Sequence, residues 1–475
     1  MIILFAVLCL VSGLHACSDS PVNGGNGDPD IDPPINGDVD VYLTTGNRLV
    51  LFDRQNSFDF SDSPAGVTIT IDETEVFQPV TGFGAAMTGS SAYLITRMEA
   101  SARTALLEEL FDPEEGIGIS NIRLTIGASD FSLGNYSYCD EEGIENFAIP
   151  ATDRRDLIPL MKEILSISPD LWIMASPWSA PAWMKTSGTM NGGRLKHEHF
   201  DDFALYLKLY VEAFEAEGIP INAITIQNEP LHETGGYPTM FMPWEDQNVF
   251  IRDHLGPLFA SSGIDTKIII YDHNWDNYQY PINILNDQET RRFVDGSAFH
   301  GYGGNVGQMS NVSDVHPDKA LYFTEISGGG WATGFWPNIT WNIDNIFFGT
   351  MRNNSQNVIL WNLALDEQDG PKNGGCQNCR GVVTIRGNDG IIRNEEYYLL
   401  AHLSRFIRPG YRRVSTTINQ GNLSAMAFTG DGPDVLVVMN NTDFSQQFRV
   451  TSAKGNFIYT IPGQALGTFI WQSSD

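Results

Sequence analysis

Hydrophobic and polar residues alternate near both ends of the chain. Residues 67–71 read Val-Thr-Ile-Thr-Ile, and this period of two is typical of a strand with one buried face. Comparable runs return at residues 423–429, 434–439, 447–450 and 467–471. Neither set alone makes a complete sheet domain. We therefore expect residues 39–79 and 408–475 to pair into one β-sandwich, which would bury both apolar faces.

Between these ends, residues 80–407 alternate short apolar runs with helical patterns. The expected strands are residues 121–126, 172–176, 223–227, 267–271, 296–300, 321–324 and 358–361. Helices are expected at residues 153–166 and 200–217, among others. Strands that alternate with helices predict parallel βαβ units. This many strands fit an eight-stranded barrel. The predicted fold class is therefore α/β, a (β/α)8 TIM barrel with the attached β-sandwich.

The first 38 residues predict export. Residues 1–17 are apolar but too short to span a bilayer, which is typical of a signal peptide. Leu14-His15-Ala16-Cys17 resembles a bacterial lipobox, in which Cys17 would be lipidated; alternatively, Cys17 is incidental to an ordinary cleaved signal. Residues 18–38 are rich in Gly, Pro, Asp and Asn and predict a flexible linker. We expect an outer-membrane or cell-surface lipoprotein tethered through Cys17, or a periplasmic or secreted protein.

The charge balance limits the partners. Among 475 residues there are 28 basic and 58 acidic ones, which gives a formal net charge of −30. A surface this acidic repels nucleic acids and other polyanions, so a nucleic-acid partner is not expected and a neutral substrate is favoured. The 10 Trp and 16 Tyr residues supply flat apolar faces that suit sugar rings as well as protein cores.

Two carboxylates stand at the ends of expected strands. Glu229 ends the run Ile-Thr-Ile-Gln-Asn-Glu, and Glu325 ends Leu-Tyr-Phe-Thr-Glu. An unpaired charge there would be costly in a plain core, whereas the C-terminal ends of barrel strands carry catalytic groups. A lone glutamate would more often form an ion pair or a cap, but two at matching positions predict a paired-carboxylate glycosidase. One must be protonated, with a raised pKa, and the other ionised.

Other strand ends carry candidate substrate-binding residues, namely Arg123, Trp178, Trp183, Asn228, His300, Tyr302 and Trp361. Asn228 could bind a sugar hydroxyl, Arg123 and Tyr302 could keep a carboxylate ionised, and the tryptophans could stack on pyranose rings. Alternatives stay open, since Trp183 and Trp361 could merely cap the barrel and Arg123 could form a structural ion pair. Asp130 and His300 could be scaffold or substrate contact. The glycine-rich run 82–86 is expected just after the first strand.

Cys376 and Cys379 form a Cys-x-x-Cys pair. A zinc site would need two more ligands, and the sequence has no second pair. A thioredoxin-type motif would need its own fold context. In an exported protein, a local disulfide between Cys376 and Cys379 is the better interpretation. Cys139 stands alone and is expected to be a small buried residue.

Several motifs together resemble glycoside hydrolase family 30, the family of glucosylceramidases and β-1,6-glucanases. They are Gly82-Phe83-Gly84, the run 175–185 (Ala-Ser-Pro-Trp-Ser-Ala-Pro-Ala-Trp-Met-Lys), Gln227-Asn228-Glu229-Pro230, His300-Gly301-Tyr302, Phe323-Thr324-Glu325 and the run 361–365 (Trp-Asn-Leu-Ala-Leu). They span nearly all of residues 80–407, and the flanking β-segments fit the family's side sandwich.

This resemblance implies a retaining double displacement on a neutral β-glucan or β-glucoside. Glu229 would be the acid/base and Glu325 the nucleophile. The subsite of the cleaved sugar would be lined by Trp178, Asn228, Tyr302 and Trp361. No metal or organic cofactor is implied.

The substrate prediction depends on departures from the family pattern. Glucosylceramidase-like members carry an Asp after the glycine motif that would bind glucose, and Gly89 stands at that place here. Residues 376–384 resemble the β-1,6-glucanase branch instead. We therefore predict a β-1,6-glucanase, with a glucosylceramidase-type β-glucosidase or a xylan-active enzyme as alternatives. A non-catalytic glycan-binding lipoprotein is the alternative outside the enzymes, although binding alone would not require both Glu229 and Glu325.

Overall fold

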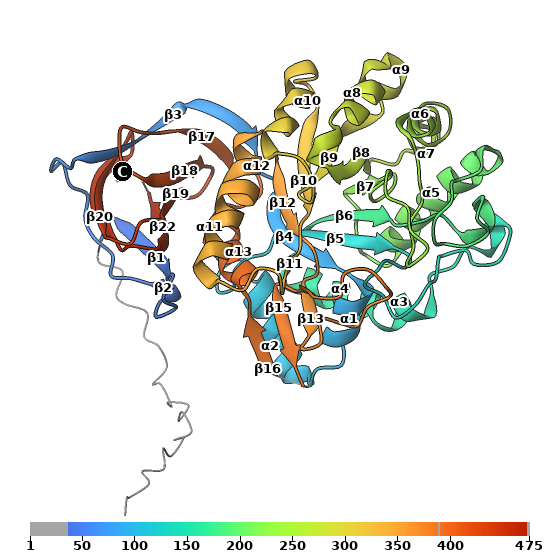
Figure 1. Cartoon of the computed structure of the whole chain (residues 1–475), viewed down its shortest axis with the longest axis horizontal. Coiled ribbons are helices and arrows are strands. Elements are labelled where there is room, and N and C mark those ends of the chain that lie inside the picture. Colours follow the sequence, from blue (N-terminus) through green and yellow to red (C-terminus); the bar gives the residue numbers. More distant parts are fainter. Residues whose placement is uncertain (1–36, 388–389, 473–475) are drawn as a thin grey trace, which may run out of the picture.

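The computed structural model describes residues 37–387 and 390–472, which form a barrel beside a curved, mostly antiparallel sheet (Figure 1). The predicted signal peptide, Cys17 and all but the end of the predicted linker lie outside the described residues, so those predictions stay predictions. Within the described ranges, no helix combines the length and the apolar character that crossing a membrane requires.

The barrel is a sheet of parallel strands. In sheet order these are β10 (Ala320–Glu325), β9 (Val294–His300), β8 (Lys267–Asn274), β7 (Ala223–Thr225), β6 (Trp172–Pro177), β5 (Asn121–Ile126), β4 (Gly82–Met87) and β12 (Asn357–Leu360). The two end strands also meet, because Leu321 bridges Ser355 and the Gln356 N–H donates to the Leu321 carbonyl at 2.8 Å. The predicted α/β barrel is confirmed.

The first barrel strand corrects one expectation. Residues 82–86 lie within β4 itself and not in the turn after it. A Cβ on Gly84 would lie 1.7 Å from the Asn121 carbonyl oxygen of β5. Glycine is needed here because the neighbouring backbone approaches so closely, and the sequence pattern alone did not distinguish this role from that of a turn.

Helices surround the barrel (Figure 1). They are α1 (Gly89–Ile95), α2 (Ala100–Phe111), α3 (Ala151–Arg155), α4 (Leu157–Ile167), α5 (Phe200–Ala216), α6 (Trp244–Val249), α7 (Gly256–Ser262), α8 (Gln279–Asn286), α9 (Gln288–Arg291), α10 (Ser310–Val315), α11 (Phe335–Asn342), α12 (Phe348–Arg352) and α13 (Glu395–Ser404). In α4, Leu157, Leu160, Met161 and Ile164 are buried with the spacing of one helical face. The single helix expected at 153–166 is two, separated at Asp156, whose carboxylate accepts from Arg97 and Arg155.

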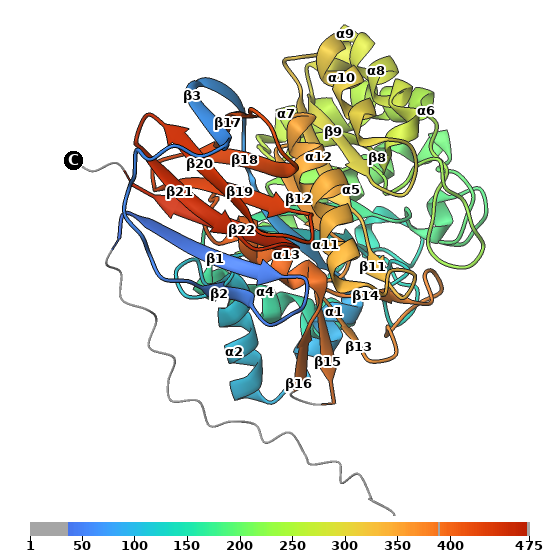
Figure 2. The same cartoon turned by 60° about the vertical axis from the view of Figure 1, so that its left-hand side comes forward.

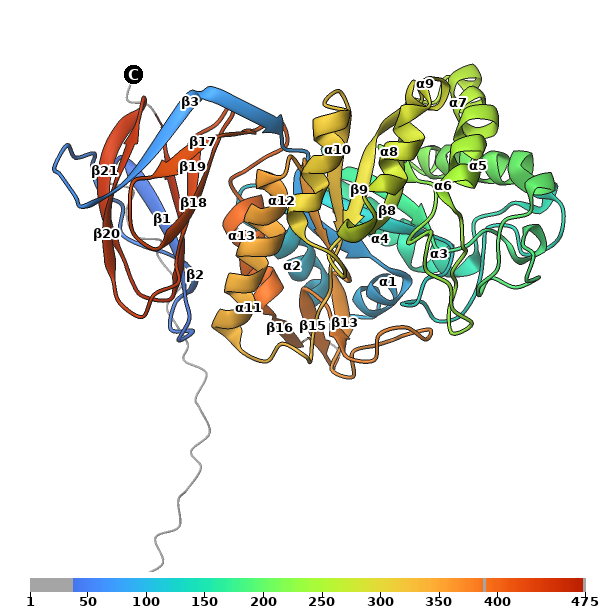
Figure 3. The same ribbon diagram turned by 45° about the horizontal axis from the view of Figure 1, so that its top comes forward.

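The second unit joins both ends of the chain in one sheet. Its order is β2 (Leu51–Arg54), β1 (Val39–Thr45), β22 (Ala465–Trp471), β19 (Asp434–Asn440), β18 (Leu423–Thr429), β17 (Arg412–Ile418), β3 (Val67–Pro79), β20 (Gln446–Ser452) and β21 (Gly455–Ile461). Figure 2 shows β1 beside β22, and Figure 3 shows β3 running from this sheet toward the barrel. The predicted pairing of the terminal segments is confirmed, whereas β21 was not foreseen.

The two units are joined by a buried histidine. His402 of α13 contacts the hydroxyl oxygens of Thr468 in β22 and Thr44 in β1, each at 2.8 Å. Burial lowers the pKa of His402 to about 3, so the ring is neutral and joins barrel helix to sheet without a buried charge.

Two small sheets lie at the end of the barrel where the strands finish. One pairs β11 (Gly328–Gly329) with β14 (Cys379–Arg380), and the other contains β13 (Ala364–Asp366), β15 (Val383–Arg386) and β16 (Gly390–Arg393). Cys376 and Cys379 are joined by a disulfide with their Cα atoms 5.6 Å apart, and Cys139 is a free, buried thiol. The disulfide therefore closes a short loop next to β11.

Candidate active site

Glu229 and Glu325 lie at the same end of the barrel. Glu325 is the last residue of β10, and Glu229 follows β7 with a left-handed backbone (φ 45°). Few non-glycine residues adopt this conformation. It is held here because the Glu229 N–H donates to the Asp272 carbonyl at 2.9 Å and the Asn228 N–H to the Pro177 carbonyl at 2.8 Å. A carboxylate oxygen of each glutamate lies within 4.8 Å of the other.

Arg123 is the buried cation beneath this pair. Its guanidinium donates to Glu325 at 2.5 Å, to Asp272 at 2.8 Å and to the side-chain oxygen of Asn228 at 2.7 Å. Arginine stays protonated in proteins and its fork holds two acceptors at fixed angles. One side chain of β5 therefore orients groups from β7, β8 and β10.

Asp272 stands at a strand end where the sequence placed polar residues, but no role in the site was predicted for it. It is fully buried, and its carboxylate accepts from Arg123, from Thr225 and Thr324 at 2.7 Å each, and from Ser176. Burial opposes ionisation, but Arg123 and His300 hold the pKa of Asp272 well below its usual range. Its signal in the sequence was a polar run after an apolar strand, and the backbone at Asp272 is also left-handed (φ 64°).

His300 joins Asp272 to Glu229. Its Nε2 lies 3.0 Å from Asp272 and its Nδ1 lies 3.2 Å from Glu229. Burial lowers the pKa of His300, but the carboxylates of Glu325, Asp272 and Glu229 outweigh it and raise the pKa to about 9. The ring is fully buried behind Glu229 and does not line the cavity. Of the two roles that the sequence left open, these contacts favour the scaffold, because His300 holds Glu229 and Asp272 in place.

The pKa values of Glu229 and Glu325 are shifted in opposite directions. Burial raises the pKa of Glu229, but the hydrogen bond and charge of His300 reverse this and lower it. Burial and the neighbouring Glu229 carboxylate raise the pKa of Glu325, against the attraction of His300 and Arg123. From the sequence, the raised pKa was expected on Glu229, the predicted acid/base. In the structure the order is reversed, because the His300 imidazolium faces Glu229 directly.

The glutamates open into a cavity of about 410 Å³. Its lining residues are Asp130, Trp178, Asn228, Glu229, His232, Tyr237, His273, Asn274, Tyr302, Glu325, Trp331, Trp361, Cys376 and Cys379. Trp178 and Trp361 stack with ring centroids 4.9 Å apart, and the Tyr302 hydroxyl donates to Glu325 at 3.0 Å. Aromatic walls with a few convergent polar groups are typical of sugar sites. His273 and Asn274 are the last residues of β8, whereas His232, Tyr237 and Trp331 come from loops. The sequence assigned none of these five residues a role in the site.

Trp183 and Gly89 both lie outside the cavity lining. The Trp183 indole N–H donates to the Cys139 carbonyl at 3.0 Å, and the ring packs edge-on to His199, away from the cavity lining. Trp183 therefore has the packing role left open by the sequence. Gly89 begins α1 and also lies outside the lining. Asp130 lies in the cavity lining.

Glu229, His300 and Glu325 also place ligand atoms within 4.8 Å of one another, close enough to hold a metal ion. Each of these groups already has a protein partner, since His300 contacts Glu229 and Arg123 donates to Glu325. A second cation beside Arg123 would be repelled. The donor set therefore fits an acid/base pair better than a metal site.

The folded protein should lose stability as the pH rises, because His300 loses its proton. Its pKa is about 9 in the folded protein against an ordinary 6.5, so the folded state binds this proton more tightly. This contribution, on the order of 3 kcal/mol, is complete below pH 6.5 and is lost as pH rises through about 9. Urea unfolding at pH 6.5 and 9.5 should show the loss. A decline of equal size in His300→Gln would contradict this assignment.

Comparison with known proteins shows the family of the chain. The family model of the glycosyl hydrolase family 30 TIM-barrel domain matches residues 80–407, and that of the family 30 beta sandwich domain matches residues 410–469. The chain belongs to glycosyl hydrolase family 30. It is a glycoside hydrolase with a carbohydrate substrate, and the alternative of a binding protein without activity is wrong.

Relatives within family 30 differ in their named activities. An endo-1,6-beta-D-glucanase of Aspergillus fumigatus is 33% identical over 82% of this chain and 82% of its own length. The lysosomal acid glucosylceramidase of Mus musculus is 29% identical over 98% and 94%. The solved structure of the endo-beta1,6-glucanase BT3312 superposes with a TM-score of 0.88 at 38% identity, covering 92% of this chain and all of that one.

Proposed function

We propose that this protein is a retaining endo-β-1,6-glucanase. The observation that carries the mechanism is the spacing of Glu229 and Glu325, whose oxygens lie within 4.8 Å. Retaining glycosidases hold their carboxyl groups about 5–5.5 Å apart, whereas inverting ones leave about 6.5–9.5 Å for a water molecule. The shorter spacing supports direct attack by a carboxylate.

In the first step, Glu325 attacks the anomeric carbon while Glu229 gives its proton to the departing glycosidic oxygen. Arg123 and Tyr302 hold Glu325 in place through their hydrogen bonds. A sugar that fills the cavity displaces water from Glu229, and this desolvation raises its pKa toward the protonated form. The products of this step are a glycosyl ester on Glu325 and the free leaving chain.

In the second step, Glu229 removes a proton from water, which attacks the anomeric carbon and releases Glu325. Esterification removes the negative charge of Glu325, so the repulsion that favoured protonation of Glu229 disappears and the pKa of Glu229 falls. The same residue can therefore act first as acid and then as base. Two displacements at one carbon leave the product in the β configuration.

The choice of β-1,6-glucan is supported by the relatives. The curated endo-1,6-beta-D-glucanases are 31–33% identical to this chain, and the glucosylceramidases 26–29%. The disulfide loop adds support, because Cys376 and Cys379 line the cavity and belong to the stretch that resembles the glucanase branch. Asp130 and Asn228 offer an acceptor and an amide to sugar hydroxyls within the same cavity.

Hydrolysis of a substrate panel tests this proposal. Purified enzyme is expected to release reducing sugar from pustulan, a β-1,6-glucan, at least about tenfold faster than from laminarin or xylan, since each wrong linkage misplaces the chain by ångströms. Glucosylceramide and gentiobiose complete the panel, and Glu325→Gln serves as the inactive control. Preferred cleavage of glucosylceramide or xylan would overturn the proposed substrate.

We also propose that the enzyme is exported and held at a membrane through lipidated Cys17. The apolar leader and the lipobox-like Leu14-His15-Ala16-Cys17 support this. The composition of residues 18–38 is that of a tether between the anchor and the folded unit. Detergent-phase partition of the full-length protein should depend on Cys17, and equal partition of Cys17→Ser would refute the anchor.

A further inference from the structure

A second hollow adjoins the catalytic cavity. It has a volume of about 560 Å³, and its lining includes Tyr302, Ser327, Trp331, Thr333, Pro337 and Trp341. Tyr302 and Trp331 line both hollows, so the two meet at these residues. The side chains of Trp331, Trp341 and Tyr302 are 57%, 46% and 45% exposed. Large aromatic rings this open are uncommon on a surface that binds nothing.

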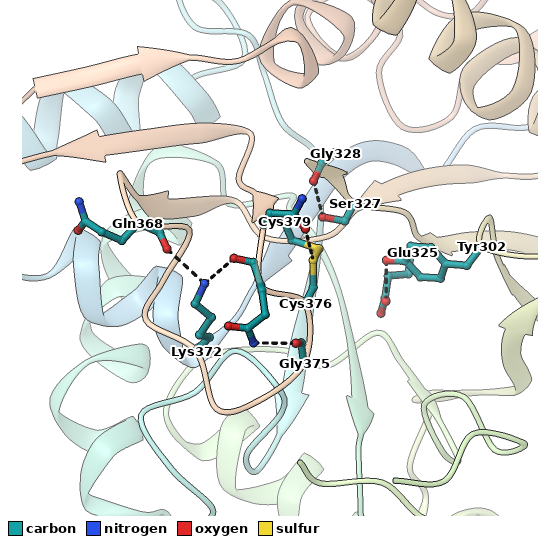
Figure 4. Close-up of a disulfide and its surroundings, with 11 residues drawn as sticks. Tyr302, Glu325, Ser327, Gly328, Gln368, Lys372, Gly375, Cys376 and Cys379 are labelled. Carbon is teal, nitrogen blue, oxygen red and sulfur yellow. Dashed lines mark hydrogen bonds between the residues drawn. A yellow bond between two sulfur atoms is a disulfide. The ribbon is translucent and has the colours of Figure 1, made fainter. Parts of the chain in front are cut away.

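Trp331 is fixed by the disulfide loop. Gly329 pairs with Cys379 between β11 and β14, and the Gly330 N–H donates to the Asn378 carbonyl at 2.8 Å. A Cβ on Gly329 would lie 2.2 Å from the Trp331 ring, so glycine lets the ring lie against the strand. Figure 4 shows the disulfide beside Ser327 and Gly328, which follow Glu325 closely in the chain. The backbone that leads into Trp331 is therefore paired with a covalently closed loop.

The hollow lies on the side of the leaving group. The buried Trp178 and Trp361, from the ends of β6 and β12, form the closed wall of the catalytic cavity. The opposite side is formed by the ends of β8, β9 and β10, where Asn274, Tyr302 and Glu325 lie. If the sugar that Glu325 attacks fills the closed side, the oxygen that Glu229 protonates points to the open side, where the hollow begins.

We propose that this hollow, residues 301–302 and 326–342, binds the leaving part of the β-glucan chain, with Trp331 and Trp341 as stacking platforms for its glucosyl units. The inference rests on the proposed function. We assign a glucan chain to the hollow because the hollow is continuous with the catalytic cavity at Tyr302 and Trp331. Flat indole rings match the apolar faces of β-glucosyl units. Ser327, Thr333 and Asn338 along the same lining supply polar groups for hydroxyls, which a lipid chain would leave unpaired.

Rates on β-1,6-linked oligosaccharides of increasing length, from gentiobiose to the hexamer, and on pustulan test the inference. Trp331→Ala is expected to lower kcat/KM on the longer chains by about tenfold, the equivalent of one lost aromatic contact. Trp341→Ala should act only on chains long enough to reach it. Phe444→Ala is the matched control, because Phe444 is 61% exposed on the turn between β19 and β20, outside the barrel.

The outcomes separate this inference from the proposed function. If the wild-type enzyme cleaves no β-1,6-glucan, the proposed function and the inference fall together. If it does, and both tryptophan variants keep wild-type rates at every length, only the inference falls. Long-chain alkyl glucosides are assayed in parallel. If the tryptophan variants lose activity only on these substrates, the hollow binds a lipid chain and the inference is overturned as well. Melting temperatures of the three variants within a few degrees of wild type would exclude misfolding as the cause.

Discussion

Glu325→Ala is expected to lower kcat on pustulan by on the order of 10⁴-fold or more, because no other group can form the covalent intermediate. Glu325 lies at the end of β10, and Arg123 and Tyr302 aim its two oxygens. Water in its place would be a weak and poorly placed nucleophile. Stopped assays of reducing sugar over hours would measure the residual rate.

Azide provides the control for this assignment. The space left by the shorter alanine can admit azide, which would attack an activated aryl β-glucoside from the same face and yield an α-glucosyl azide. Glu325→Gln should be equally inactive but not rescued, because its side chain still fills the space. Near-normal hydrolysis by Glu325→Ala, or a β-configured azide product, would contradict the nucleophile assignment.

Replacing Arg123 by methionine is expected to destabilise the fold by about 3–5 kcal/mol, the cost of leaving buried charges without their partner. The side chains of Arg123 and Asp272 are fully buried, and that of Glu325 is nearly so. Methionine fills most of the space but leaves Asp272 and Glu325 facing each other without a cation. Activity should fall as well, because Glu325 and Asn228 lose their shared donor.

The pH dependence distinguishes this explanation from simple loss of packing. Without Arg123, the buried carboxylates have pKa values above their unfolded ones, so protonation in acid favours the folded state. The stability deficit in urea unfolding should therefore shrink as the pH falls from 7 toward 4. Arg386→Met, on a surface arginine of β15, is the control and should cost little. A deficit that does not change with pH would contradict the charge-based account.

The fold was largely readable from the sequence because its signals are local. The apolar strands end at polar residues with regular spacing, and alternating runs mark both flanks. The roles of the glycines were harder to predict. Residues 82–86 have the composition of a turn, but Gly84 lies in a strand and allows β5 to approach closely. Asp156 divides a helix that hydrophobic spacing alone would continue.

The two glutamates of the site could be predicted from the sequence, but the groups that orient them could not. Arg123 and Glu325 are 202 residues apart, and their 2.5 Å contact depends on the closure of the barrel. Asp272 and His300 resemble any polar strand end until the strands are assembled. Trp183 shares a motif with Trp178, yet the short helical turn Ala182–Met184 turns it toward Cys139. Side-chain direction and charge networks are tertiary properties, so local patterns do not contain them.

The most direct test of the retaining mechanism is proton NMR of pustulan hydrolysis in its first minutes, before the product mutarotates. The close approach of Glu229 and Glu325, whose oxygens lie within 4.8 Å of each other, predicts that newly formed reducing ends appear first as the β-anomer and then equilibrate. Initial appearance of the α-anomer would mean a single inverting displacement by water. It would contradict the assignment of Glu325 as nucleophile and Glu229 as acid/base.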